Sequence, residues 1–195
     1  MRAAGCPVLF LGSLFERPEV KDLLSLLSLL VDGRAMGLLR VGRLPEFQMS
    51  LSDVAAVINQ LREINGADSA WLRDLDRLPV SPEAKVALHR LAVALDGFDE
   101  TSSPWHLIAK FLLDRTQIAA RIAVAGSIAE RSQGLALWQF LNFLRFQPAD
   151  TGLPTRRLLE RVRRLVRIGD DRDLRQLLQA ALHLNAVRLM DDSRI

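Results

Sequence analysis

The stretch Pro18-Glu-Val-Lys-Asp-Leu-Leu-Ser-Leu-Leu-Ser-Leu-Leu-Val31 contains a strong helical pattern. Its apolar residues recur at spacings of three and four, which places them on one face of an α-helix. These residues are Val20, Leu23, Leu24, Leu27, Leu30 and Val31. Proline is favoured in the first helical turn and glycine follows helix ends, so we predict a helix that begins near Pro18 and ends at Asp32-Gly33.

Further along the chain, three serines mark the starts of more helices. Ser50-Leu-Ser-Asp53 resembles a capping box, while Ser81 and Ser103 each precede a proline that suits the first helical position. The helix after Ser81 is expected to turn Val86, Leu88, Leu91, Val93 and Leu95 inward. Four more helices are predicted over residues 118–128, 135–146, 155–168 and 171–184, and in the second of these Trp138, Phe140, Phe143 and Phe146 follow core spacing.

Convincing strand signals occur only at the two ends of the chain. They are Pro7-Val-Leu-Phe-Leu11 and Asn185-Ala-Val-Arg-Leu-Met190. A lone pair of short strands buries little surface and stabilises a domain little. We therefore predict a mainly α fold class, a multi-helix body with one short strand near each end, inserted into a larger α/β protein in which the two strands would pair.

The composition is that of an ordinary globular chain. It has 195 residues, of which 49% are hydrophobic and 25% charged, and this is long enough for one domain with a sizeable core. The single cysteine, Cys6, cannot form an intrachain disulfide, which favours a cytoplasmic location. The apolar runs are too short or too interrupted to span a bilayer, so no membrane partner is expected.

No constellation of residues with catalytic or metal-binding spacing stands out. His89, His106 and His183 are far apart and match no ligand pattern, and Cys6 has no activating neighbour in the sequence. Gly12-Ser13-Leu14-Phe15 lacks the second glycine of a nucleophile elbow, and the phosphate-binding pattern G-x-x-x-x-G-K-[ST] does not occur. We predict no catalytic residue, no metal site and no cofactor in this chain.

Positive charge is concentrated in the second half of the chain. Residues 106–195 contain 15 basic and 9 acidic residues, against 11 and 14 in residues 1–105. On the helix predicted over 155–168, an apolar stripe is formed by Leu158, Leu159, Val162, Leu165 and Val166. Five arginines spread across the opposite arc, namely Arg156, Arg157, Arg163, Arg164 and Arg167. DNA phosphate is the natural partner of such a face, and an acidic protein surface or plain solvation are the alternatives.

The start of the chain resembles one protein family. Leu11-Gly-Ser-Leu-Phe-Glu-Arg-Pro-Glu-Val-Lys-Asp22, with the Leu-rich helix after it, resembles the segment G-G-x-x-F-F-E-R-x-E-I-K-D of UvrD/Rep-type superfamily 1 ATP-dependent DNA helicases. In that family the segment leaves the second motor domain, 2A, and enters a helical insertion, 2B. The resemblance implies a remnant of 2A with its strand over 1–15, a 2B-like domain over 16–184, and a returning strand with a truncated tail over 185–195.

The resemblance also implies roles for particular residues. The segment that would couple motor movement to the helical domain contains Phe15, Glu16, Arg17, Glu19, Lys21 and Asp22, for which capping and local ion pairs are the alternative interpretation. Residues 44–50 stand where family members commonly carry a Gly-Ile-Gly hairpin, which the chain lacks.

For function, the resemblance implies a fragment of a 3′-5′ DNA helicase. Its partners would be DNA and the motor domains of the parent enzyme, which would also bind ATP and Mg²⁺, and the chain alone is expected to hydrolyse no ATP. The alternative is a stand-alone helical protein-interaction module that uses the basic helix. A stand-alone enzyme is a third, weaker reading, because the sequence offers no catalytic constellation.

Overall fold

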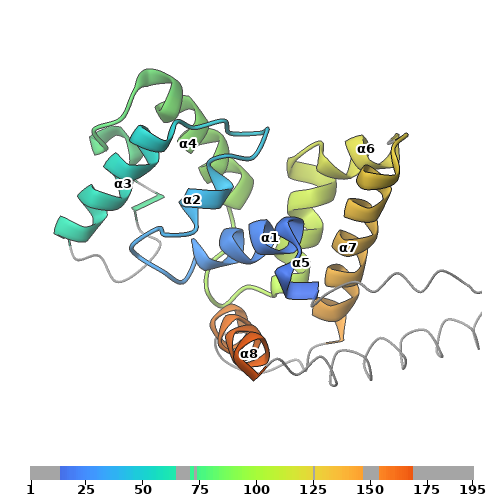
Figure 1. The fold of residues 1–195 in the computed structure, drawn as a ribbon. Coiled ribbons are helices and arrows are strands. Elements are labelled where there is room, and N and C mark those ends of the chain that lie inside the picture. The colour runs from blue at the N-terminus through green and yellow to red at the C-terminus, as the bar shows by residue number, and fades with distance from the viewer. Residues whose placement is uncertain (1–13, 65–70, 73, 125, 147–153, 169–195) are drawn as a thin grey trace, which may run out of the picture.

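The structure is a computed structural model that describes residues 14–64, 71–72, 74–124, 126–146 and 154–168 (Figure 1). The elements of these residues are η1 (Leu14–Glu16), α1 (Pro18–Ser28), α2 (Leu38–Val41), α3 (Leu51–Ile64), η3 (Leu75–Arg77), α4 (Pro82–Leu95), α5 (Pro104–Lys110), the π-helical turn η4 (Phe111–Arg115), α6 (Ile118–Ala123), α7 (Ile128–Arg145) and α8 (Pro154–Ile168). The mainly α fold class is therefore confirmed. The strands predicted at 7–11 and 185–190 and the helix predicted at 171–184 lie outside the described residues.

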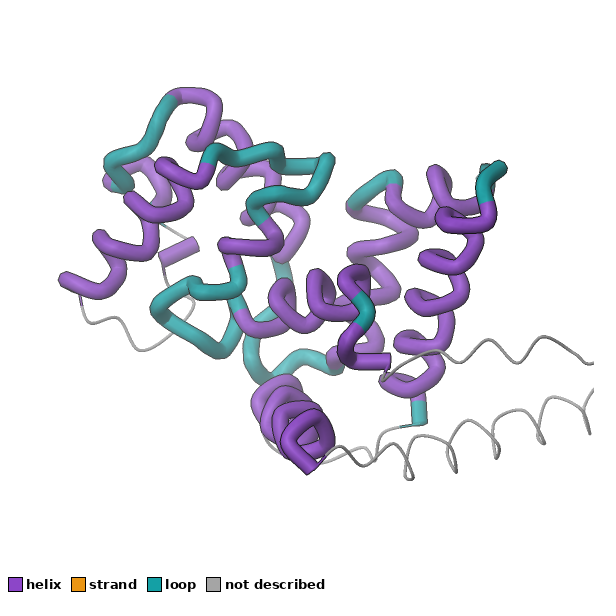
Figure 2. Tube along the Cα trace, viewed as in Figure 1, coloured by secondary structure: helices purple, strands orange, loops and turns teal. Residues whose placement is uncertain are grey.

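Helix α1 lies at the centre of the fold, between α2, α3 and α4 on one side and α5, α6 and α7 on the other (Figures 1 and 2). It packs directly against α2, α7 and α8. Its predicted apolar face is confirmed for Val20, Leu23, Leu27 and Leu30, which are at most 2% exposed, whereas Leu24 and Val31 are half-buried. Burying such a side chain contributes about 1.5–3 kcal/mol, so α1 organises the core.

The C-terminal end of α1 differs from the prediction. The α-helix stops at Ser28, and the amides of Leu29, Leu30 and Val31 bond to carbonyls three residues back, as in a tightened final turn. The Ser28 hydroxyl donates a hydrogen bond to the Ser25 carbonyl at 2.7 Å, which satisfies one carbonyl of this last turn. The short helix α2, which the sequence analysis did not predict, follows these turns.

The serine caps are confirmed at all three helix starts. Ser81 Oγ accepts a hydrogen bond from the Ala84 amide at the start of α4, and Ser103 Oγ accepts one from the His106 amide at the start of α5. At the start of α3, Ser50 Oγ accepts from the Asp53 amide at 3.1 Å. Each cap satisfies one of the free amides of a first helical turn, which is why these starts could be located from sequence.

The predicted buried face of α4 is confirmed for Leu88, Leu91 and Leu95, which are at most 3% exposed, but not for the two valines. Val86 and Val93 are 52% and 63% exposed, whereas the stripe on the other side of the helix is buried. That stripe consists of Ala84, Ala87, Leu88, Leu91, Ala94 and Leu95. The two valines lie seven residues apart and share a face, but the alanine-rich face is the one that meets the core.

Two corrections concern the helices around α7. The helix predicted over 118–128 ends at Ala123, because Ser127 and Glu130 form a capping box that starts α7 at Ile128. Of the four aromatic residues predicted to pack, Phe140 and Phe143 are buried, but Trp138 and Phe146 are 50% and 48% exposed. Trp138 lies on the outer face of α7, opposite the two buried rings, whereas Phe146 follows the last residue of the helix.

Asp53 connects the starts of α3 and α4. Its carboxylate accepts hydrogen bonds from Ser50 Oγ at 2.6 Å, from the Ser81 amide at 2.9 Å and from Ser81 Oγ at 3.0 Å. These bonds favour the ionised form and hold the pKa of Asp53 below its usual value.

A pH dependence of stability follows from this lowered pKa. The stabilisation is present above the unfolded-state pKa of Asp, about 3.9, and is lost as the pH falls through the lower pKa of the folded state. We expect urea titrations from pH 6 down to about pH 2 to show a falling free energy of unfolding. In Asp53→Asn this fall should be smaller. Parallel curves for the two proteins would contradict the assignment to Asp53.

Candidate functional site

Helix α8 is strongly amphipathic and lies along one end of the helical body, beneath α1 (Figure 1). It packs against α1 and α5 through Leu158, Leu159 and Val162, which are 5–8% exposed. Val166, which was predicted to belong to the same apolar stripe, is 49% exposed, so this part of the prediction is wrong. The buried stripe is thus narrower than predicted and ends before the last turn.

The start of α8 is fixed to the loop that precedes α5. Thr155 is fully buried and donates a hydrogen bond from Oγ1 to the Ser102 carbonyl at 3.0 Å. Arg156 pairs with the Glu100 carboxylate at 2.9 Å. This arginine, one of the five predicted to meet phosphate, is therefore already engaged with an acidic side chain of the same chain.

The other predicted arginines of α8 differ in what the structure describes. Arg157, Arg163 and Arg164 are exposed. Arg167 lies in the last turn of α8, and its side chain is outside the described part of the chain. The one acidic residue of this helix, Glu160, is also exposed, so the outer face of α8 carries a net positive charge.

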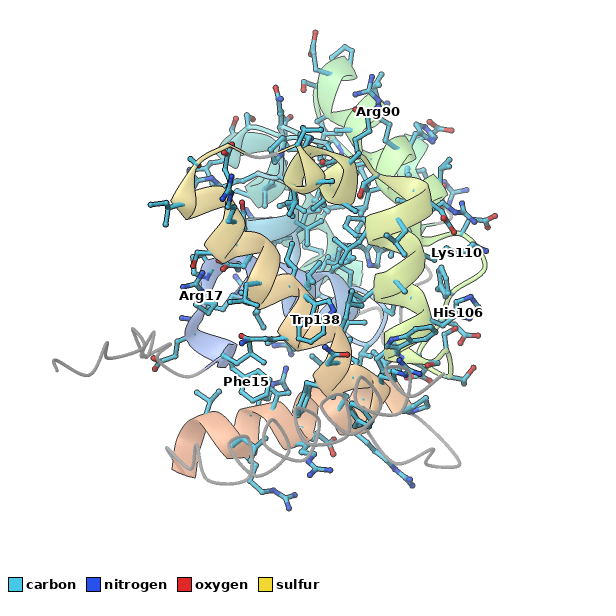
Figure 3. The ribbon with its side chains drawn as sticks, turned by 90° about the vertical axis from the view of Figure 1, so that its right-hand side faces the viewer. Phe15, Arg17, Arg90, His106, Lys110 and Trp138 are labelled. Atoms are coloured by element: carbon cyan, nitrogen blue, oxygen red, sulfur yellow. The ribbon has the colours of Figure 1, made fainter. Side chains whose placement is uncertain are left out.

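The segment where the chain enters α1 is anchored in the helical body. Phe15 is 2% exposed, and its ring meets that of Phe143 in α7 edge to face at a centroid distance of 5.1 Å. The Arg17 guanidinium pairs with Glu19 at 2.7 Å and donates hydrogen bonds to the carbonyl and hydroxyl oxygens of Ser132, also in α7 (Figure 3). These contacts join η1 and the start of α1 to α7.

The remaining predicted residues of this segment fall into two groups. Asp22 pairs with Arg40 of α2 at 2.7 Å, and Arg40 also donates a hydrogen bond to the Pro18 carbonyl. Burial raises the pKa of Asp22, although the Arg40 charge acts in the opposite direction. Glu16 and Lys21 are exposed. The structure thus brings four of the six residues into contacts that link α1 to α2 and α7, and the coupling role itself stays a prediction.

The structure contains a cavity and a groove that the sequence did not predict. A cavity of about 220 Å³ is lined by four carboxylates, Glu19, Asp22, Glu46 and Glu130, together with Arg121, which pairs with Glu46. An open groove of about 710 Å³ runs along the exposed valines of α4. Its basic side chains are His89, Arg90, Arg115 and Arg121. These residues come from distant segments, so no local motif could have predicted them.

Within the described residues, no group of three or more histidine, cysteine, aspartate or glutamate side chains is placed to hold a metal ion. No helix in this part of the chain combines the length and apolar character needed to cross a membrane. Comparison with protein-family models, with curated proteins and with solved structures finds no match to this chain.

Proposed function

We propose that this chain is the helical 2B-type accessory domain of a UvrD/Rep-like ATP-dependent 3′-5′ DNA helicase, and that it contacts DNA through the phosphate backbone. The observation that carries the proposed contact is the outer face of α8, where Arg157, Arg163 and Arg164 are exposed. Guanidinium groups bind phosphate oxygens in a planar, bidentate geometry.

A contact made to phosphates carries no sequence information, so the proposed binding is non-specific. The anchored entrance segment supports the proposed place of this chain beside a motor domain. Movement of a motor domain attached before η1 would be transmitted through Arg17 to α7 and through Phe15 to the core, because these side chains bond to or pack against α7. The sequence contains no phosphate-binding loop, so ATP and Mg²⁺ would be bound by the motor domains of the parent enzyme.

Charge removal on α8 tests the proposed contact. In Arg163→Gln/Arg164→Gln, length and hydrogen bonding capacity are largely kept while two charges are lost. Both side chains are exposed, so the fold should persist. Each phosphate that the protein neutralises contributes about 0.9 to the slope of log K against log salt for duplex DNA. If both arginines meet phosphates, the slope should therefore flatten by about 1.8. Fluorescence anisotropy of a labelled duplex over a series of salt concentrations measures both slopes.

A variant with the same charge change on another helix is the matched control. Arg43→Gln/Arg62→Gln removes two exposed arginines from the region of α2 and α3, and it should leave the slope within experimental error of the parent. Equal slopes for all three proteins, or no DNA binding by the parent at low salt, would contradict the proposal. The Arg156–Glu100 pair shows that α8 can hold a carboxylate, so that outcome would favour the alternative of a module that docks an acidic protein.

A further inference from the structure

The outer face of α7 carries a row of exposed side chains directly opposite its buried face. The row contains Ile128, Arg131, Leu135, Trp138, Arg145 and Phe146. At 100° per residue these positions fall within an arc of about 100°, while Phe140 and Phe143 point the other way into the core. Figure 3 looks toward this side of the molecule, with Trp138 near the middle of α7.

Trp138 has an arginine on either side at equal spacing. Arg131 precedes it by seven residues and Arg145 follows it by seven, so each lies about two helical turns, or about 10.5 Å along the axis, from the indole. The stretch from Arg131 to Arg145 contains no aspartate or glutamate. Glu130 directly precedes Arg131, but its carboxylate bonds to Ser127, and among the described residues neither arginine of the row makes an ion pair.

A half-exposed indole flanked by guanidinium groups has the chemistry of a platform for unpaired bases. The flat face of a base stacks on an aromatic ring, and the phosphates on either side can meet the cations. In a duplex the base faces are already stacked on each other, so only a single strand can offer a base to Trp138. We propose that the outer face of α7 binds single-stranded nucleic acid, with a base on Trp138 and phosphates at Arg131 and Arg145.

This inference rests on the proposed nucleic-acid function but uses a helix other than α8. The two surfaces would then take different forms of the substrate, α8 the phosphates of a duplex and α7 an unpaired strand. A partner protein would also be attracted by the apolar side chains of the row, but carboxylates alone cannot stack on the indole, whereas every base of a single strand can. Stacking on Trp138 therefore distinguishes a single strand from a protein partner.

Tryptophan fluorescence reports that stacking directly. The chain has three tryptophans, of which Trp71 is 7% exposed, Trp105 is 41% exposed and Trp138 is 50% exposed. Trp105→Phe therefore leaves Trp138 as the one exposed fluorophore. On titration with single-stranded oligo(dT) at low salt we expect quenching in Trp105→Phe. The quenching should be absent in Trp105→Phe/Trp138→Phe, which keeps a ring for stacking but has no exposed indole.

Affinity for oligo(dT) gives a second readout. Trp138→Ala should bind about 5- to 150-fold more weakly, the range that corresponds to the loss of one stacked base. Each neutralised phosphate of a single strand contributes about 0.7 to the slope of log K against log salt, so Arg131→Gln/Arg145→Gln should flatten this slope by up to about 1.4. Arg43→Gln/Arg62→Gln, with the same loss of charge near α2 and α3, should behave as the parent does. Circular dichroism confirms that each variant is folded.

Three results would overturn the proposal. Oligo(dT) binding without quenching of Trp138 would place the strand elsewhere. If Arg131→Gln/Arg145→Gln and Arg43→Gln/Arg62→Gln weaken oligo(dT) binding equally, the effect comes from the net charge of the protein and not from α7. Self-association of the chain without DNA, abolished by Trp138→Ala, would make the row a protein interface. In each of these cases the proposed function would still stand if duplex binding depends on Arg163 and Arg164. If duplex binding does not depend on them but oligo(dT) still quenches Trp138, only the proposed contact at α8 is removed.

Discussion

Phe140→Ala is expected to lower the free energy of unfolding by about 3–5 kcal/mol. The Phe140 side chain is 0% exposed, and its ring stacks on that of Phe143 at a centroid distance of 6.3 Å. Phe143 in turn meets Phe15 edge to face, so the three rings connect α7 with η1. Removing a fully buried ring from this cluster leaves a cavity that the neighbouring helices would have to close. Urea unfolding followed by circular dichroism measures the loss.

Phe146→Ala is the matched control for this cavity. It removes the same atoms one residue beyond the end of the same helix, but the Phe146 side chain is 48% exposed. Because about half of the Phe146 surface already faces water and no closed cavity is left, the free energy of unfolding should fall by much less than in Phe140→Ala, by about 1 kcal/mol. Equal losses in the two variants would contradict the assignment of Phe140 to the core.

The elements that could be predicted from sequence are those determined by local chemistry. Ser81 and Ser103 cap helices through amides three residues away, so both the signal and its effect lie within one helical turn. The same holds for the apolar face of α1, where Val20, Leu23 and Leu27 repeat at helical spacing and are all buried. In such segments the tertiary structure only confirms what neighbouring residues already favour.

The choice of buried residues failed in part where two faces of a helix competed. On α4 the leucines were assigned correctly, but Val86 and Val93 were assigned to the core with them. The core takes Ala84, Ala87 and Ala94 in their place. Hydrophobicity measures how much a side chain gains on burial, whereas the shape of the neighbouring helices determines which face fits. Trp138 was misplaced on α7 for the same reason, and its exposure is what makes the proposed single-strand contact available.

Long-range contacts at the candidate sites carried no sequence signal. Arg156 pairs with Glu100 across 56 positions of chain, and Arg17 reaches Ser132 across 115. The backbone turns at Ala35 and Gln48, with φ of 50° and 49°, were also undetectable because neither is the glycine or asparagine that usually marks such a conformation. The exposed arginine face of α8 could be predicted, since helical periodicity alone separates it from Leu158, Leu159 and Val162.

Gly37→Ala is expected to destabilise the fold by about 1–3 kcal/mol or more. Gly37 has φ and ψ of −57° and −22°, which every residue adopts easily, so the requirement for glycine is purely steric. A Cβ at this position would lie 2.2 Å from the Ser25 carbonyl oxygen and 2.5 Å from Ser28 Oγ. The serine side chain could rotate away, but the carbonyl belongs to the backbone of α1. Helix α2 would therefore have to move off α1 and expose Leu38 and Val41, both 0% exposed.

Gly126→Ala supplies a control of opposite sign. Gly126 has a φ outside the left-handed region, and a Cβ there would meet no atom within 4 Å. Alanine restricts the unfolded chain more than glycine does, so this variant should gain about 0.4–1 kcal/mol in the free energy of unfolding. In paired urea titrations, the same added methyl group is thus expected to lower the free energy of unfolding at Gly37 and to raise it at Gly126. A Gly37→Ala protein as stable as the parent would mean that α1 and α2 can separate freely, and the close approach at Ser25 would then contribute nothing to the position of α2 on the core.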